Sequence, residues 1–285
     1  MTDSAAASPP GASIESGTDT VLAEVRAGVG IITLNRPERR NALHPDMYTA
    51  VPQLLERFFA DPEVGCILLT AAGNAFCAGG DVRDGRRRRE RSAERSGEAP
   101  PPPSVEAAAE ALPEPARMVM LLHEGPKISI AALPGPAVGA GIGVALAADL
   151  RIVAASARLI PGWGRLAFSG DFGGTWFLTQ FLGASRALAV LIDDETIDAS
   201  RGLELGLFNR VVPDAELAGA AFEWARKIAG QPQTTLRFFK ENVQAATRLP
   251  LRDALPLESE RMVRSAQTEE HQAAVRRWLA EKRIL

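Results

Sequence analysis

The chain has 285 residues, of which 46% are hydrophobic and 24% are charged, an ordinary globular composition with enough apolar residues for one large domain. Its formal net charge of −3 at pH 7 gives it no general attraction to nucleic acid or to an anionic membrane, so we expect neither as a partner. It has no run of about 18 apolar residues, and its N-terminus lacks the basic start and apolar core of a signal peptide, which argues against a transmembrane helix and against secretion.

The N-terminal part predicts a tail, a hairpin and a helix. Residues 1–18 are rich in Ala, Ser, Gly, Pro and Thr and should be disordered. Val21–Val25 and Gly30–Leu34 are apolar runs joined by a short segment that contains glycine, a pattern typical of a β-hairpin. Asn41–Phe59 carries apolar residues at helical spacing and should form a helix.

Three further apolar runs predict buried strands, at Cys66–Thr70, Ile128–Leu133 and Arg151–Ala155. Because these strands alternate with helical segments, we expect α/β layering. The two cysteines, Cys66 and Cys77, lie in or close to the first of these runs. Their number and position favour a reduced, cytoplasmic setting over a disulfide framework.

The sequence therefore divides into an α/β body over residues 19–213 and an all-helical region over residues 214–285. Helices in the second region are expected over about 214–230, 234–247, 251–265 and 268–282. An insert at residues 85–105 interrupts the body with a run of arginines followed by a run of prolines, and such a composition predicts a flexible surface loop. Its arginines either attract phosphate groups or only keep the loop solvated.

Two turns of small residues stand out, at Asn74–Asp81 and at Pro136–Gly143. Each follows a buried apolar run and is expected to open a helix. Two such turns can aim backbone N–H groups at one point, which is how a protein stabilises a developing oxyanion without a charged side chain. Acyl transfer and enolate chemistry on thioesters need a site of this kind.

With these turns and four other segments, the chain resembles the enoyl-CoA hydratase/isomerase (crotonase) superfamily. The other matching segments are Val29–Leu43, Ala147–Arg151, Gly173–Trp176 and Gly206–Pro213. The resemblance implies a spiral of ββα repeats with an all-helical C-terminal region that helps to build a homotrimer or a dimer of trimers. It also implies an acyl-CoA thioester as the substrate, with coenzyme A entering as part of it and with no bound cofactor or metal.

By the same resemblance, the oxyanion donors are the backbone N–H groups of Gly80 and Ala140. The residues around them would contact the substrate, namely Ala42, Ala78, Gly79, Asp81, Gly139 and Gly141. Arg39 and Arg40 match a segment that contacts coenzyme A, and Lys240 matches a lysine that reaches a phosphate. Asp149 is expected to do structural work.

The sequence departs from the hydratases of this superfamily at both catalytic glutamates, whose positions are occupied by Gly143 and Trp163. The acid that remains nearby is Asp171. Isomerases of the superfamily place a lone aspartate here, which implies that Asp171 takes a proton from one carbon of an enoyl thioester and returns it to another. The alternative is that Asp171 only caps the helix that begins near Gly173.

Trp163 and Asp171 are eight residues apart, a spacing that resembles the aryl-CoA dehalogenases, in which the aspartate is a nucleophile and the tryptophan N–H bonds to it. In that chemistry a histidine also acts as the base that hydrolyses the aryl ester. His44 is expected to lie at a helix start and His123 to be structural, so neither fits that role. Trp163 could instead wall an apolar acyl pocket together with Phe168 and Phe172.

We therefore rank isomerisation first among four readings of the sequence. The others are hydration, dehalogenation or related hydrolysis, and non-catalytic acyl-CoA binding.

Overall fold

The computed structural model describes residues 11–81, 94, 104–111 and 114–282. Its largest element is a seven-stranded sheet in the order β1-β2-β3-β4-β5-β7-β10. The strands are β1 (Ala12–Ile14), β2 (Val21–Arg26), β3 (Val29–Leu34), β4 (Cys66–Ala71), β5 (Ile128–Leu133), β7 (Leu150–Ala154) and β10 (Arg210–Val212). β2 and β3 form the antiparallel hairpin expected from the sequence, and β3, β4, β5, β7 and β10 run parallel.

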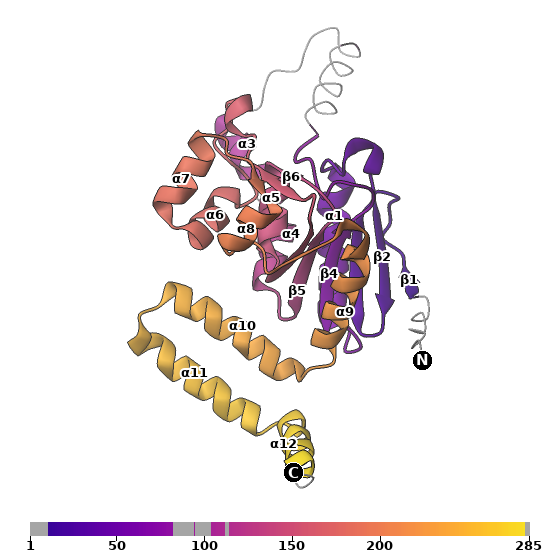
Figure 1. Cartoon of the computed structure of the whole chain (residues 1–285), viewed down its shortest axis with the longest axis vertical. Coiled ribbons are helices and arrows are strands. Elements are labelled where there is room, and N and C mark those ends of the chain that lie inside the picture. Colours follow the sequence, from indigo (N-terminus) through magenta and orange to yellow (C-terminus); the bar gives the residue numbers. More distant parts are fainter. Residues whose placement is uncertain (1–10, 82–93, 95–103, 112–113, 283–285) are drawn as a thin grey trace.

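Helices cover both faces of this sheet, which explains why its central strands are almost continuously apolar. One core cluster lies on the face covered by α1 (Pro45–Ala60), α4 (Arg117–Glu124) and α5 (Ala140–Ala147). The second cluster lies under α9 (Leu217–Ala229), which packs on β4 and β5. Figure 1 shows α1 and α9 on opposite sides of the strands.

A second, three-stranded sheet of β6 (Ala137–Val138), β8 (Arg158–Ile160) and β9 (Ile197–Asp198) lies beside the first. The helix α8 (Ala199–Glu204) contacts this sheet. The other short helices are α3 (Val105–Ala111), α6 (Gly174–Leu182) and α7 (Ala184–Ile192), and 3₁₀ turns occur at Pro37–Arg39, Gly164–Leu166 and Asp214–Glu216. Cys77, in the segment after β4, pairs with Ala137 of β6 in an isolated bridge, which brings that segment against β6.

Two expectations for the N-terminal part are corrected. The segment predicted to be disordered over 1–18 contains β1, which pairs with Val25–Ala23 of β2, because its backbone completes the edge of the sheet. Residues 1–10 lie outside the described part. The helix predicted from Asn41 begins only at Pro45, since Arg40 and Asn41 have left-handed φ values of 50° and 54° and His44 is extended.

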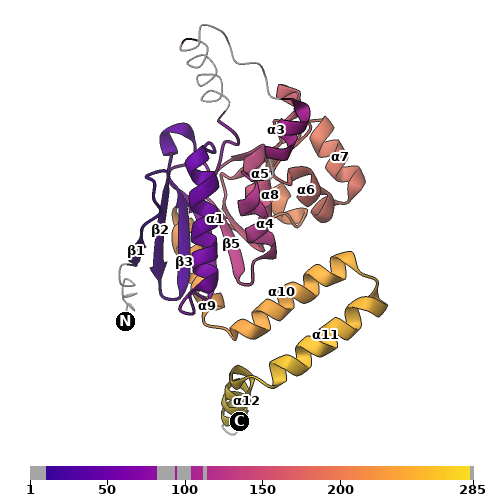
Figure 2. The same ribbon diagram turned by 180° about the vertical axis from the view of Figure 1, so that it is seen from behind.

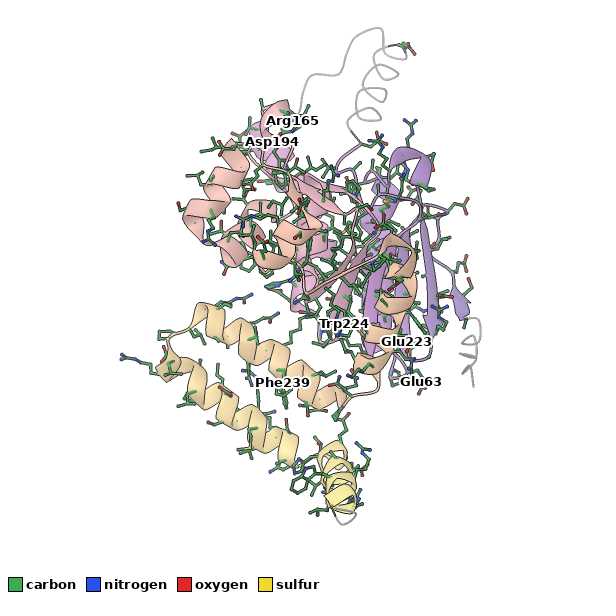
Figure 3. All side chains as sticks on the ribbon, viewed as in Figure 1. Glu63, Arg165, Asp194, Glu223, Trp224 and Phe239 are labelled. Atoms are coloured by element: carbon green, nitrogen blue, oxygen red, sulfur yellow. The ribbon has the colours of Figure 1, made fainter. Side chains whose placement is uncertain are left out.

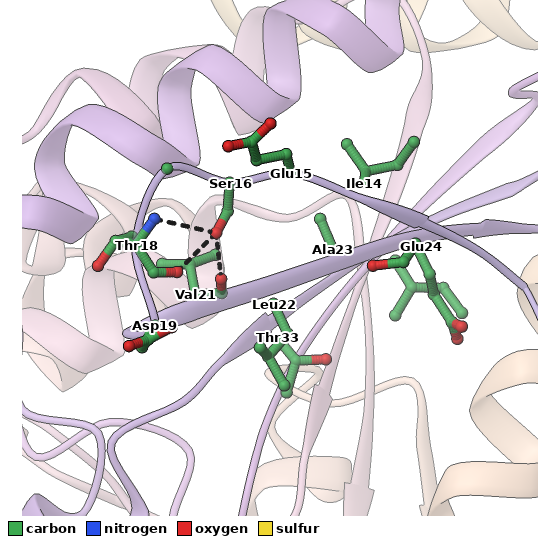
Figure 4. Close-up of a pocket in the computed structure, with 13 residues that line it drawn as sticks. Ile14, Glu15, Ser16, Thr18, Asp19, Val21, Leu22, Ala23, Glu24 and Thr33 are labelled. Carbon is green, nitrogen blue, oxygen red and sulfur yellow. Dashed lines mark hydrogen bonds between the residues drawn. The ribbon is translucent and has the colours of Figure 1, made fainter.

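A hollow of about 750 Å³ lies beside this N-terminal strand. The Ser16 hydroxyl donates to the carbonyls of Thr18 and Val21 at 2.7 and 2.5 Å, and Figure 4 shows these residues lining the hollow. It shares no residue with the two small-residue turns or with Asp171.

The C-terminal region is helical, as the sequence predicts. After α9 follow α10 (Gln233–Arg248), α11 (Leu251–Ala266) and α12 (Glu269–Lys282). Figures 1 and 2 show these three helices extending away from the α/β body. None of the helices in the described ranges is long and apolar enough to cross a membrane. The insert predicted at residues 85–105 falls almost wholly outside those ranges.

Candidate active site

The first small-residue turn is held from one side by the segment before α1. The Ala78 amide donates to the carbonyl of Arg40 at 2.9 Å, and the Leu43 amide donates to the carbonyl of Gly79 at 2.8 Å. Ala42, between them, is buried. The structure therefore places Arg40, Ala42, Ala78 and Gly79 side by side.

The second turn lies directly against the first. Val138 N donates to the carbonyl of Cys77 at 2.8 Å, and Phe76 N donates to the carbonyl of Pro136 at 3.0 Å. Gly79 has a φ of +81°, and a β-carbon there would lie 2.8 Å from the Val138 carbonyl oxygen and 3.5 Å from the Ala140 nitrogen. Only glycine fits this position, and its lack of a side chain lets the two turns meet.

The amides of Gly80 and Ala140 belong to the two turns, and Gly80 is exposed whereas Ala140 is buried. Ala140 is the first residue of α5. The amide of Gly139, just before it, donates to the Ile160 carbonyl at 3.0 Å. Gly141, just after it, packs against the Cys77 carbonyl. A β-carbon on Gly80 would meet nothing within 4 Å. Within the described part of the chain, neither amide donates to a protein acceptor. A backbone N–H at a helix start, like that of Ala140, can stabilise negative charge.

Asp171 is bound by the indole of Trp163, whose Nε1–H donates to Oδ1 of the carboxylate at 2.8 Å. The Trp163 side chain is buried, whereas Asp171 is exposed. The indole nitrogen also lies 3.7 Å from where a β-carbon of Gly139 would stand, which ties this pair to the second turn. The alternative that Asp171 caps α6 is not supported, because Gly173 is the N-cap residue and the helix has no side-chain cap.

The positions of the missing glutamates are occupied by protein atoms. A β-carbon on Gly143 would stand 2.1 Å from the carbonyl oxygen of Phe172. The loop that carries Asp171 therefore passes where a hydratase side chain would begin. Trp163, at the other glutamate position, supplies an indole N–H in place of a carboxylate.

The predicted aromatic wall is only partly present. Phe172 is buried and its ring centroid lies 6.0 Å from that of Tyr48, a residue that the sequence analysis did not select. Phe168 is 61% exposed, because the left-handed Ala167 turns the chain outward before it. In this chain Phe168 therefore does not close a wall with Trp163 and Phe172.

Asp81 stabilises the first turn through Arg36. Arg36 Nη2 donates to Asp81 Oδ2 at 3.1 Å, and Nη1 donates to the carbonyl of Ala42 at 2.7 Å. Beside them the buried Asn41 accepts from Arg36 N and donates to the carbonyls of Ala72 and Ala75, all at 2.8 Å. Sequence reasoning missed Arg36 and Asn41 as parts of the site. Arg39 is half-buried and Arg40 exposed, so both side chains remain near the surface.

Lys240, which matches a phosphate-reaching lysine by resemblance, forms a buried ion pair within this chain. Its side chain is 5% exposed, and its ammonium donates to Asp149 Oδ2 at 2.9 Å and to the Leu122 carbonyl at 3.0 Å. Asp149 also accepts from the amide and hydroxyl of Ser129 at 2.8 and 3.0 Å. Asp149 thus has the structural role expected for it, and Lys240 shares that role.

Neither the Cys77 thiol nor the two histidines of the body compete with Asp171 for chemistry. Burial raises the pKa of the Cys77 thiol to about 12, with a further contribution from the Asp171 carboxylate, so the thiol is protonated at neutral pH. His44 accepts from the Asp46 amide at the start of α1. His123 packs edge-on against Trp176 and Phe177, and burial, with Lys240, lowers its pKa.

Comparison with known proteins agrees with this geometry. The family model described as enoyl-CoA hydratase/isomerase matches residues 24–284. The 1,2-epoxyphenylacetyl-CoA isomerase of Escherichia coli is 32% identical over 92% of this chain and 96% of its own length. A 4-chlorobenzoyl coenzyme A dehalogenase of Arthrobacter is 30% identical over 76% of this chain and 75% of its own.

Among solved structures, a putative enoyl-CoA hydratase/isomerase from Mycobacterium abscessus superimposes with a TM-score of 0.80 at 30% identity, covering 92% of this chain and 96% of that one. The ordered motifs, the converging turns and these matches lead to one conclusion: the chain belongs to the enoyl-CoA hydratase/isomerase family and is an acyl-CoA-processing enzyme.

Proposed function

We propose that this enzyme moves the double bond of an enoyl-CoA by proton transfer through Asp171. The thioester carbonyl oxygen accepts hydrogen bonds from the amides of Gly80 and Ala140. The Asp171 carboxylate removes a proton from the α-carbon of a β,γ-enoyl thioester, and the electron pair moves onto that oxygen as a dienolate. The protonated Asp171, whose proton can exchange with solvent, then donates a proton to the γ-carbon, so that the product is the α,β-enoyl thioester.

The observation that carries this proposal is the single carboxylate. Asp171 lies beside the two turns, and the space of a hydratase glutamate at Gly143 is taken by the Phe172 carbonyl. Adding water across a double bond calls for a second group to position the water, whereas returning a proton does not. The transfer is redox-neutral, so it draws on no cofactor beyond the coenzyme A of the substrate. The E. coli relative named as an isomerase supports the same reaction class.

The test is mass spectrometry of trans-3-hexenoyl-CoA incubated with the enzyme in deuterated water. We expect a moved double bond, deuterium at the α- or γ-carbon and no added water. Asp171→Asn should lower kcat by about 10²–10⁴-fold, because a positioned general base contributes that much. Addition of water would make the protein a hydratase. An unchanged, undeuterated substrate would contradict isomerisation of this acyl chain.

A second candidate is nucleophilic attack by Asp171 on an aryl-CoA. The Trp163–Asp171 hydrogen bond of 2.8 Å favours it, as does the dehalogenase relative. This mechanism predicts a covalent aryl ester on Asp171 when 4-chlorobenzoyl-CoA is added, visible as a mass increase of the intact protein. Tight thioester binding that Asp171→Asn leaves unchanged, without turnover of either substrate, would instead support a binding protein.

We also propose that the enzyme is a homotrimer or a dimer of trimers and acts in the cytoplasm. The exposed apolar side chains of the C-terminal helices support the assembly. The two buried, unpaired thiols support a reducing compartment. Coenzyme A contacts are assigned to Arg39, Arg40 and the backbone around Ala42, beside the first turn.

A further inference from the structure

Within the described residues, Trp163 is the one side chain that donates a hydrogen bond to Asp171, so the position of its indole orients that carboxylate. The residue stands at the start of a 3₁₀ turn, Gly164–Leu166, between left-handed Gly162 and left-handed Ala167. Within the turn the carbonyl of Trp163 accepts from Leu166 N at 3.0 Å and Phe168 N at 2.9 Å. These bonds shape the turn but do not attach it to the rest of the protein.

One side chain from another element makes that attachment. Asp194 Oδ1 accepts from the amide of Gly162 at 2.6 Å, and Oδ2 accepts from Nε of Arg165. The carboxylate therefore bridges the residue before Trp163 and the residue two positions after it. Figure 3 shows Arg165 and Asp194 side by side near the end of α7.

Asp194 is itself held firmly. It follows α7 with a left-handed φ of 51°, which is uncommon for a residue with a β-carbon, and its side chain is only 15% exposed. The turn lies close to the helix, because a β-carbon on Gly164 would be 3.9 Å from the Leu191 carbonyl oxygen. The ion pair with Arg165, which is 67% exposed, contributes little, so the Gly162 bond is the important one.

We propose that Asp194 is a positioning residue for the reaction: it holds the Trp163 turn against α7 and thereby sets the indole that orients Asp171. This inference rests on the proposed role of Asp171. Asp194 does not touch the substrate. Its loss should leave thioester binding intact and reduce the fraction of enzyme in which Asp171 faces the reacting carbons.

The experiment compares Asp194→Ala, Asp194→Asn and Arg165→Gln with the full-length wild type on trans-3-hexenoyl-CoA. We expect Asp194→Ala to lower kcat about tenfold with KM nearly unchanged, because misplacement of a catalytic group affects the transition state more than substrate binding. Asp194→Asn keeps an oxygen for the Gly162 amide and should recover most of kcat. Arg165→Gln should stay close to wild type.

A second readout does not depend on activity. In protein labelled with ¹⁵N at the indoles of its four tryptophans, the Trp163 signal is assigned by its loss in Trp163→Phe. Asp194→Ala should shift this signal and speed its hydrogen exchange, while Asp194→Asn should not.

The matched control is Asp214→Ala, because Asp214 also accepts a backbone amide from a distant segment, that of Ser156 at 3.0 Å. The proposal is overturned if the Trp163 signal of Asp194→Ala coincides with that of the wild type, or if Asp214→Ala reduces kcat equally. If the wild type does not act on the probe, the proposed function fails, and the indole signal still decides the role of Asp194.

Discussion

Gly143 in α5 faces the carbonyl of Phe172, and this contact separates the chain from a two-glutamate hydratase. Because a β-carbon would stand 2.1 Å from that oxygen, Gly143→Glu should not restore hydration. Gly143→Ala alone should destabilise the protein by about 1–3 kcal/mol, the usual cost of overpacking, and should lower activity by displacing the Asp171 loop. Urea unfolding and the deuterium assay measure the two effects.

The control for this substitution is Gly219→Ala in α9, where an added β-carbon meets nothing within 4 Å. There alanine should be neutral or stabilise the helix by about 0.5–1 kcal/mol. Equal behaviour of the two variants would contradict the close approach of Phe172.

Cys66 and Cys77 give a second prediction for single residues. Burial raises the pKa of both thiols from 9.0 to about 12, so in the folded protein they stay protonated where an exposed thiol ionises. Native protein at pH 8 should therefore not react with Ellman's reagent, and two thiols should react after unfolding in guanidinium. Rapid reaction of the native protein with the reagent would contradict the burial of these two thiols.

The same shifts have a consequence for stability. Between pH 9 and pH 12 the unfolded chain releases both thiol protons and the folded chain keeps them, so the folded state loses stability as the pH rises through this window. Cys66→Ala/Cys77→Ala should have a smaller fall in unfolding temperature between pH 8 and pH 10 than the wild type.

At the scale of elements, the buried pair of Lys240 and Asp149 attaches α10 to the loop between α5 and β7. Lys240→Met should destabilise the protein by about 3–5 kcal/mol, since it leaves Asp149 charged without its partner. Lys240→Met/Asp149→Asn should recover part of this loss. Lys227→Met, which changes an exposed lysine of α9, should stay within about 0.5 kcal/mol of the wild type in urea unfolding.

The elements themselves follow from local patterns, and the misses have physical causes. The long strands β2, β3, β4, β5 and β7 and the C-terminal helices were predictable from apolar runs and helical spacing, whereas the short strands β6, β8, β9 and β10 were not predicted. The start of α1 was not predictable from periodicity, because periodicity does not detect the left-handed backbone of Arg40 and Asn41. Pro45 in the first turn of the helix was the available signal. The strand at Ala12–Ile14 depends on pairing with β2, which composition does not reveal.

The site was predictable where its residues lie in motifs that resemble those of the family. The spacing of Trp163 and Asp171 predicted their contact, and the Gly-rich turns predicted the convergence near Ala140. The ion pair of Lys240 was not predictable, because its partner Asp149 is 91 residues away and only the packed structure brings the two together. Asp194 was overlooked for the same reason.

For the whole molecule, the three C-terminal helices expose several large apolar side chains, and a patch of exposed apolar side chains can mark an interaction site. On α11, Leu251, Leu255, Met262 and Val263 are 50–77% exposed, while Arg261 fixes the helix to α10 through Glu241 at 2.8 Å and Asn242 at 2.9 Å. The helix is therefore held in place with its apolar side chains uncovered. In the proposed trimer, a second copy of the chain covers these apolar side chains of α11.

This arrangement predicts that charges on α11 dissociate the assembly without unfolding the body. Leu255→Glu/Met262→Glu should convert a trimer into monomers in size-exclusion chromatography with light scattering, because two carboxylates cannot be buried unpaired in an apolar interface. Glu258→Gln, at an exposed polar position of the same helix, should leave the trimer intact. A monomeric wild type at micromolar concentration would contradict the assembly, and a double variant that remains trimeric would move the interface away from α11.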